Sequence, residues 1–116
     1  MAVQPIIDQR NVIDEALIRE VTDRIVQAFH PRRIILFGSQ ARGDARPDSD
    51  MDLFIEMETG LDFYSRIPPI IELFGFRKWS MDVIVNTPAE VAHDKQINGT
   101  LANLVEKEGR VLYERD

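Results

Sequence analysis

The sequence has no cysteine, which excludes disulfide bonds and zinc sites with thiolate ligands. It has two histidines, His30 and His93, whose spacing matches no metal-binding pattern, so we assign neither a part in the mechanism. No apolar run approaches the roughly 18 residues that a membrane-spanning helix needs. The first residues, Met1 to Pro5, lack the basic and apolar segments of a secretion signal. We therefore expect a cytoplasmic protein with no membrane segment.

Basic residues are also scarce, because 14 Lys and Arg stand against 20 Asp and Glu, giving a net charge of -6. An acidic chain is repelled by nucleic-acid phosphates, so direct nucleic-acid binding is disfavoured. The 116 residues, of which 44% are hydrophobic, suffice for one compact core and show no repeat or linker. We expect residues 11–116 to form a single domain and residues 1–10 to be a frayed N-terminus.

What the sequence does contain is an alternation of helix and strand patterns, typical of the α/β (α+β) class. The segment 14–29 carries apolar residues at helical spacing, with Asn11 or Asp14 as its start signal and the helix breaker Pro31 beyond its end. Thr87-Pro88-Ala89-Glu90 has the form of a capping box and should open a helix. The other expected elements are strands at 33–37, 51–57, 81–86 and 111–113, a helical turn at 38–43, a helical region at 61–74 that Pro68 and Pro69 split, and a last helix marked by Ile97, Leu101, Leu104 and Val105.

The most informative segment joins an apolar strand to a Gly-Ser turn and then to two acidic residues. Ile34 to Phe37 run into Gly38-Ser39, whose free backbone N–H groups suit an anionic phosphate at the start of a short helix. A second apolar strand follows and begins with Asp50 and Asp52. Because strand side chains alternate, both carboxylates point to one face, where they suit a hard cation. An isolated Asp-x-Asp pair carries little weight in so acidic a chain, so the prediction depends on the order of the parts.

Gly38-Ser39-x-Ala41-Arg42-Gly43, followed by Ser49-Asp50-x-Asp52-Leu53, resembles the signature of the DNA-polymerase-β-like nucleotidyltransferase superfamily. The short length and the spacing most resemble its minimal nucleotidyltransferase (MNT) domains, of the HEPN/MNT antitoxin type. The resemblance implies a single-domain nucleotidyltransferase fold, with a mixed β-sheet flanked by helices. It also implies a third carboxylate on a neighbouring strand, for which Asp82 is the match. An aspartate that only ends the preceding turn is the alternative for Asp82.

The resemblance assigns roles to these residues. The candidate catalytic and metal-binding carboxylates are Asp50, Asp52 and Asp82. They would hold two Mg²⁺ ions, with the first two bridging both ions and Asp82 completing the ion that activates the incoming hydroxyl. Gly38 and Ser39 would hold the β- and γ-phosphates of ATP. Arg42 is a further nucleotide-binding candidate, with a solvated loop arginine as the alternative.

Transfer of AMP to a hydroxyl fits these groups, and 116 residues leave no room for a separate substrate domain, so we expect another molecule to present the acceptor. By resemblance, that molecule is a helical HEPN-type ribonuclease toxin. The chain would then be an antitoxin that transfers AMP from ATP to a hydroxyl of the toxin, with tyrosine as the expected acceptor. Phe74, Phe76 and Trp79 either pack in the core or form an apolar surface for this partner, and the pattern does not separate the two.

Two alternatives stay open at this point. The chain could be a binding-only antitoxin or assembly subunit with a vestigial nucleotide pocket. It could also transfer a nucleotide to a small molecule at the interface of a homo-oligomer. The intact set of Gly38, Ser39, Asp50, Asp52 and Asp82 favours the enzyme.

Overall fold

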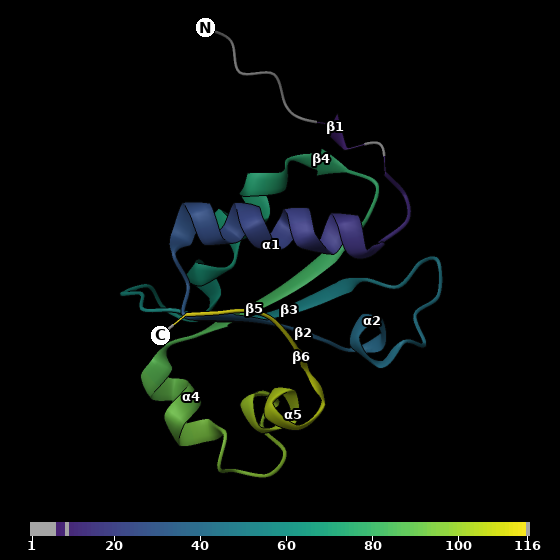
Figure 1. Cartoon of the computed structure of the whole chain (residues 1–116). Coiled ribbons are helices and arrows are strands. Elements are labelled where there is room, and N and C mark those ends of the chain that lie inside the picture. The colour runs from purple at the N-terminus through teal and green to yellow at the C-terminus, as the bar shows by residue number, and fades with distance from the viewer. Residues whose placement is uncertain (1–6, 9, 116) are drawn as a thin grey trace, which may run out of the picture.

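The computed structural model describes residues 7–8 and 10–115 of the chain. It is built around a four-stranded mixed sheet with the strand order β5-β3-β2-β6 (Figure 1). The strands are β2 (Arg33–Phe37), β3 (Met51–Glu56), β5 (Met81–Asn86) and β6 (Arg110–Glu114). Strand β2 is antiparallel to both β3 and β6, whereas β3 and β5 are parallel. The predicted mixed sheet is therefore confirmed, and the four predicted strands differ from the observed ones only at their ends.

Helix α1 (Glu15–Phe29) covers one face of this sheet (Figure 1). Its start is fixed by Asp14, whose side chain accepts a hydrogen bond from the Leu17 N–H at 2.9 Å. Leu and Ile side chains of α1 are buried against the strands because they recur at the helical period. The core on this side includes Leu17, Val21, Ile25, Leu36, Leu53, Ile70 and Val83.

The segment between β3 and β5 adds a short helix to the same side. Helix α3 (Pro68–Ile71) lies between two 3₁₀ turns, η1 (Tyr64–Arg66) and η2 (Glu72–Phe74). The proline pair occupies the first helical positions, where a missing N–H costs no hydrogen bond. The expected helical region at 61–74 is thus present and is split at the prolines, as predicted.

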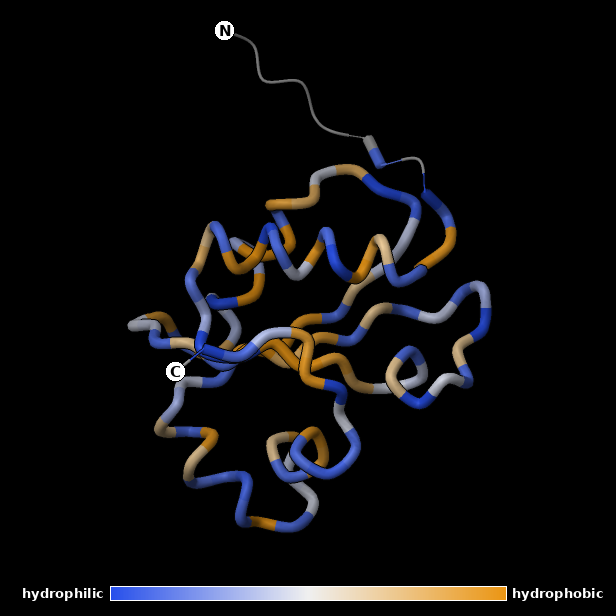
Figure 2. Tube along the Cα trace, in the orientation of Figure 1, coloured by the Kyte–Doolittle hydropathy of each residue, from blue (hydrophilic) through white to orange (hydrophobic). Residues whose placement is uncertain are grey.

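Two helices cover the opposite face of the sheet, α4 (Pro88–Asp94) and α5 (Leu101–Glu108) (Figure 1). The capping box that opens α4 is confirmed, because the Thr87 N–H donates to Glu90 Oε1 at 2.7 Å and the Glu90 N–H donates to Thr87 Oγ1 at 3.2 Å. Figure 2 shows the apolar strands enclosed between the helical layers. The core on this side consists of Ile35, Phe54, Val91, Ala102 and Val105.

The prediction that Ile97 belongs to the last helix is wrong. Ile97 lies in the turn between α4 and α5 and is 44% exposed. Gly99 lies just before α5 and has a φ of +92°, which is not helical and separates Ile97 from that helix. The Thr100 side chain then caps α5 by accepting a hydrogen bond from the Asn103 N–H at 3.1 Å. Leu104 lies on α5 as predicted but faces outward, with 42% of its surface exposed.

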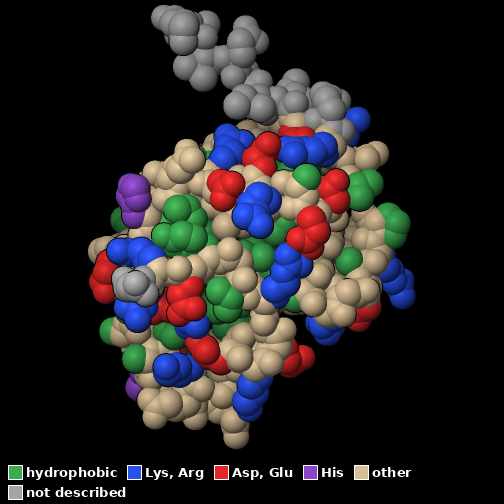
Figure 3. Space-filling model, viewed as in Figure 1, with side chains coloured by type: hydrophobic (Ala, Val, Ile, Leu, Met, Phe, Trp, Pro, Cys, Tyr) green, Lys and Arg blue, Asp and Glu red, His purple; other side chains and the backbone are tan. Residues whose placement is uncertain are grey.

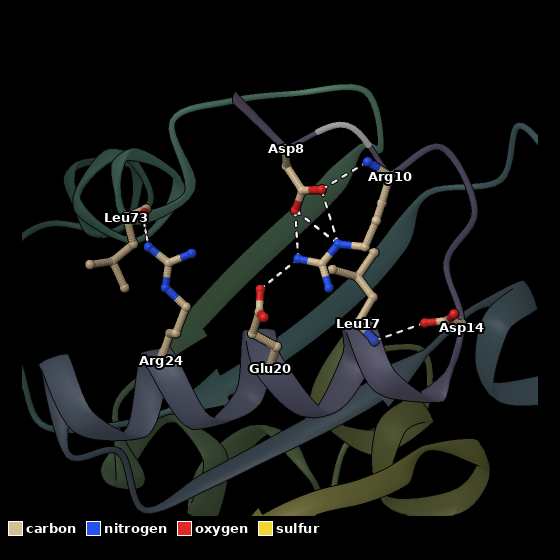
Figure 4. Close-up of polar contacts among 7 residues, drawn as sticks. All are labelled: Asp8, Arg10, Asp14, Leu17, Glu20, Arg24 and Leu73. Atoms are coloured by element: carbon tan, nitrogen blue, oxygen red, sulfur yellow. Dashed lines mark hydrogen bonds and ion pairs between the residues drawn. The ribbon is translucent and has the colours of Figure 1, made fainter. Parts of the chain in front are cut away.

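A two-residue parallel pairing outside the main sheet was not foreseen. Strand β1 (Ile7–Asp8) pairs with β4 (Phe76–Arg77) above α1 (Figure 1). Figure 4 shows how Arg10 fixes this corner: its Nη2 donates to Asp8 Oδ2 at 2.7 Å and to Glu20 of α1. The prediction of a frayed N-terminus falls largely on residues 1–6 and 9, which lie outside the described residues.

The structure shows which of the three aromatic residues Phe74, Phe76 and Trp79 are in the core and which is on the surface. Phe74 and Trp79 are core residues, 2% and 5% exposed, and their rings meet edge to face with centroids 5.8 Å apart. Neither can therefore belong to an apolar partner surface. Phe76, which follows Gly75, is 66% exposed, so it alone of the three stays a candidate for such a surface.

The described surface is charged and mixed. On the face shown in Figure 3, Lys and Arg side chains are interspersed with Asp and Glu, and neither sign forms a continuous patch. Within residues 7–8 and 10–115, no helix has both the length and the apolar character needed to cross a bilayer.

Candidate active site

The candidate site is built on one row of residues across three strands. In the sheet register, Phe37 of β2 lies opposite Asp52 of β3, and Asp52 lies beside Asp82 of β5. Side chains at paired positions point to the same face, so the two carboxylates and the Phe37 ring share the face that α4 and α5 cover further along. The placement of Asp82 next to Asp52, expected from resemblance, is what the strand register shows.

Gly38 follows this row directly and lies against the carboxylate of Asp52. A Cβ added at Gly38 would be 2.2 Å from Asp52 Oδ2, and the residue has a φ of +72°. Both observations require glycine, the first by close approach and the second by backbone conformation. The chain then forms the single turn α2 (Ser39–Arg42), which confirms the predicted helical turn. At a helix start, the N–H groups of Ser39 and Gln40 have no acceptor within the turn, so they are free to bind an anion.

Asp50 reaches the site from the loop before β3. A reciprocal contact shapes this loop, since the Arg46 N–H donates to Ser49 Oγ at 2.8 Å and the Ser49 N–H donates to the Arg46 carbonyl at 2.9 Å. Asp50 and Asp52 are both half-buried and are separated by Met51, which is fully buried. The alternation predicted for Asp50, Met51 and Asp52 is therefore confirmed.

The electrostatics of the site are those of a crowded acidic cluster. Burial raises the pKa of the Asp52 carboxyl above its usual range, and the like charges of Asp82 and Asp50 raise this pKa further. The guanidinium of Arg42 acts in the opposite direction on Asp52. Its Nε donates to Asp44 Oδ2 at 3.3 Å, and its side chain is about half exposed. The charge of Arg42 thus acts on the Asp52 carboxyl, but the side chain of Arg42 makes its hydrogen bond to Asp44.

A cleft of about 590 Å³ opens beside this row. This volume is within the range of roughly 300–1,000 Å³ that is usual for small-molecule sites. Among the described residues, Asp52 and Asp82 are the two carboxylates that line it and Arg77 is the one cation. Gly38, Ser39 and Asp50 do not line it. The remaining walls are apolar and come from both sides of edge strand β5: Phe37, Ile67, Ile71, Met81, Val83, Ile84 and Leu101.

The donor set suits a hard divalent cation such as Mg²⁺. Asp50, Asp52 and Asp82 offer only carboxylate oxygens, which Mg²⁺ prefers, and the contact with Gly38 leaves no room for a bulkier side chain beside Asp52. Within residues 7–8 and 10–115, no three acidic, histidine or cysteine side chains are already gathered in a metal-binding arrangement.

Sequence reasoning did not find Arg77, although it lines the cleft with Asp52 and Asp82. A weak signal was available, because Arg77 and Lys78 form a basic pair shortly before the strand of Asp82. For the cleft residues Ile67, Ile71 and Leu101, the sequence predicts only positions in helical segments. Their part in the cleft depends on how α3 and α5 flank β5, which no local pattern encodes.

Comparison with known proteins gives consistent results. Residues 18–108 match the model of the nucleotidyltransferase domain family. A relative from Methanocaldococcus jannaschii, named "Putative protein adenylyltransferase", is 33% identical over 104 residues, which cover 86% of this chain and 98% of the relative. A crystal structure described as a putative nucleotidyltransferase from Sulfolobus solfataricus has a TM-score of 0.62 at 20% identity, covering 86% of this chain and 79% of that one. The structural likeness concerns the fold.

Proposed function

The chain belongs to the nucleotidyltransferase domain family and is a nucleotidyltransferase, and from this premise we propose that it transfers AMP from ATP to a hydroxyl group of a partner protein. The observation that carries the proposal is the pairing of Asp52 with Asp82 beside the Gly38 turn, at the mouth of a cleft. The Methanocaldococcus jannaschii relative, which is named as a protein adenylyltransferase, supports the choice of AMP and of a protein acceptor.

The reaction assigns a task to each part of the site. The acceptor oxygen attacks the α-phosphorus of ATP, the bond from that phosphorus to the bridging oxygen breaks, and pyrophosphate leaves. The turn at Gly38 and Ser39 holds the β- and γ-phosphates, and Arg42 adds a cation near the leaving group. Asp82 takes the proton of the acceptor hydroxyl. It is exposed on edge strand β5, so an incoming hydroxyl can reach it from outside the sheet.

Asp50, Asp52 and Asp82 would hold Mg²⁺, which when bound neutralises charge on the triphosphate and on the leaving pyrophosphate. The packing of the Asp52 carboxylate against the Gly38 backbone fixes the position of this metal ligand beside Asp82 and beside the turn that holds the phosphates.

For the partner, we propose a helical HEPN-type toxin that this chain neutralises as an antitoxin, with a tyrosine as the acceptor. The support is the resemblance to MNT domains of HEPN/MNT antitoxins. The structure contributes the exposed ring of Phe76, on the segment that leads into Arg77 and the cleft, as an apolar contact for the partner.

The test is to purify the chain with a candidate HEPN protein, add Mg²⁺ and ATP labelled at the α-phosphate, and measure the intact masses of both proteins. We expect the partner to gain one or more AMP groups and Asp50→Asn to abolish the gain. Asp48→Asn is the matched control, because it removes an exposed carboxylate from the same loop. A tight complex without added AMP would favour the binding-only antitoxin. Neither complex nor modification would favour transfer to a small molecule.

A further inference from the structure

We propose that Arg77 binds the α-phosphate of the nucleotide, on the side of the site opposite to the Gly38 turn. This inference deepens the proposed nucleotidyl transfer and rests on it. Arg77 belongs to the short strand β4 and, in the part of the chain that the structure describes, is the one cation that lines the cleft of Asp52 and Asp82. It lies outside the Gly-Ser and Asp-x-Asp motifs, so neither motif accounts for it.

The guanidinium of Arg77 has donors that the described residues do not use. Its Nη1 donates to the Gly75 carbonyl at 3.1 Å, and its central carbon lies 5.1 Å from the centre of the Trp79 ring. Its Nε is buried and has no acceptor among the described residues, and no carboxylate in that part of the chain lies within ion-pair distance of it. A buried charged donor without an acceptor is unfavourable, so a ligand that supplies an anionic oxygen would be favoured here.

Two contacts position the guanidinium of Arg77 when no ligand is bound. Stacking on Trp79 and the bond to Gly75 fix one edge of the planar group. The other edge, formed by Nε and Nη2, has the geometry that matches two oxygens of a phosphate in a bidentate contact. Because Nε is buried, the guanidinium has to turn toward the cleft to bring this edge to an anion.

The order of the groups along the row selects the α-phosphate. With the β- and γ-phosphates on the Gly38 and Ser39 turn, the triphosphate runs past Asp52 toward Asp82, and its α-phosphate comes to lie on the Asp82 side. Arg77 shares the cleft with Asp82 and not with Ser39. It would therefore face the phosphate that is transferred and offset the charge that Asp82 places there. AMP carries this phosphate, whereas pyrophosphate and adenosine do not.

The experiment measures dissociation constants for ATP, AMP, pyrophosphate and adenosine at fixed Mg²⁺ by calorimetry. We expect Arg77→Gln to weaken ATP and AMP at least tenfold and to change pyrophosphate and adenosine by less than twofold. Ser39→Ala should give the complementary pattern, with pyrophosphate weakened and AMP little changed. Lys78→Gln is the matched control, since it removes the same charge from an exposed neighbour, and it should leave all four constants unchanged.

The outcomes separate this inference from the proposed function. If the native chain binds neither ATP nor AMP, the proposed function fails and Arg77 loses its ligand with it. If the native chain binds both and Arg77→Gln binds AMP as tightly, Arg77 has only a structural role beside Trp79. Should Arg77→Gln fail to fold, Arg77→Lys keeps the charge but not the bidentate edge, and it should still weaken AMP relative to adenosine. An unchanged ratio in that folded variant would also overturn the inference.

Discussion

Gly38 shows how one residue can be dictated by its neighbour across the sheet. We predict that Gly38→Ala weakens ATP binding and lowers stability, because the new Cβ would fall 2.2 Å from Asp52 Oδ2 at a φ of +72°. Gly43 provides the matched control, since it has a φ of +86° but no atom within 4 Å of an added Cβ. Gly43→Ala should lose roughly 1–2 kcal/mol from the left-handed backbone, and Gly38→Ala should lose more, because its ψ of -157° lies in a region that only glycine adopts readily. Urea unfolding and ATP titration measure both effects.

The loss of ATP affinity reports the contact with Asp52, whereas the loss of stability also contains the backbone cost at Gly38. Gly38→Ala should lose more stability and more ATP affinity than Gly43→Ala, because only the former displaces a candidate metal ligand. Equal losses of stability and affinity in the two variants would show that the packing of Asp52 on Gly38 has no part in nucleotide binding.

Asp82 gives a second prediction for a single residue. Asp82→Asn should lower AMP transfer at least ~100-fold, the lower end of the loss expected when a general base is removed, with a smaller change in ATP affinity. The amide keeps the size of the side chain but cannot accept the hydroxyl proton. Single-turnover transfer and ATP titration separate the two quantities, and Asp48→Asn tests for a non-specific effect of charge. A loss of ATP affinity as large as the loss in turnover would argue against proton transfer by Asp82.

At the scale of single residues, the sequence predicted that Asp52 and Asp82 lie together, but it did not identify every residue that lines the cleft. Asp50 and Asp52 lie at the start of one strand, so alternation relates their side chains, whereas Gly38 meets Asp52 through the antiparallel pairing of β2 with β3. Asp82 came from resemblance, and the register that places it beside Asp52 is a long-range property. Arg77 was missed because its position depends on the pairing of β4 with β1, two residues each, which carries no periodic signal.

At the scale of elements, Arg66 joins three parts of the chain. Its buried guanidinium donates to the Leu61 carbonyl at 2.9 Å, to the Val85 carbonyl at 3.0 Å and to Glu90 Oε1 at 2.7 Å. It thereby attaches the loop after β3 to the end of β5 and to the first turn of α4. The hydrogen bond from Arg66 holds the pKa of Glu90 below its usual 4.5.

We predict that Glu90→Gln destabilises the fold by about 1.5–3 kcal/mol, the scale of a hydrogen bond to a charged group. The amide oxygen can still accept from the Thr87 N–H, so the loss should come mainly from Arg66. A lowered carboxyl pKa stabilises the fold at pH values above 4.5 and loses this effect as the pH falls through the lower folded value. Urea unfolding between pH 7 and pH 3 should therefore show the two proteins converging at acid pH.

Glu108→Gln is the control for this prediction, because Glu108 is exposed and is not part of any ion pair found in the described residues. It should shift stability by less than about 0.5 kcal/mol. If Glu90→Gln instead keeps a constant deficit down to pH 3, the effect comes from the cap and not from the ion pair.

The elements themselves were largely readable from local signals, with one instructive failure. Asp14, Thr87 and the proline pair are start signals that act within one turn, and the structure confirms each of them. Ile97 misled the prediction because an apolar residue at helical spacing outweighed the turn signal of Gly99. Tertiary packing decides such cases, since Ile97 is not needed in the core that Val91 and Val105 already fill.

At the scale of the whole molecule, the sheet order concentrates the chemistry at one edge. Strand β5 is an outer strand, and the cleft wraps around it with residues from α3, α5 and β4. The opposite edge is formed by β6, which is far from Asp82 in the strand order. A protein acceptor can thus approach Asp82 beside β5 without displacing a strand. Sequence patterns gave the strands but not this order, because order depends on pairings between distant segments.

The last prediction concerns the stability of the whole domain. Mg²⁺ with ATP should raise the melting temperature, because a ligand at 100 times its dissociation constant stabilises the folded state by about 2.7 kcal/mol. Asp50→Asn combined with Asp52→Asn should abolish this shift. The same variant should be at least as stable as the native chain when Mg²⁺ is withheld, since it removes repulsion among carboxylates that the structure places together.

The control is Asp48→Asn combined with Glu58→Gln, which removes the same charge from exposed positions outside the row. It should keep the full shift with Mg²⁺ and ATP. Differential scanning calorimetry of the three proteins, with and without ligand, makes the comparison. A double Asp50 and Asp52 variant that retains the native shift would place the nucleotide elsewhere, because no other carboxylates lie in the row beside Gly38 and Asp82 among the residues that the structure describes.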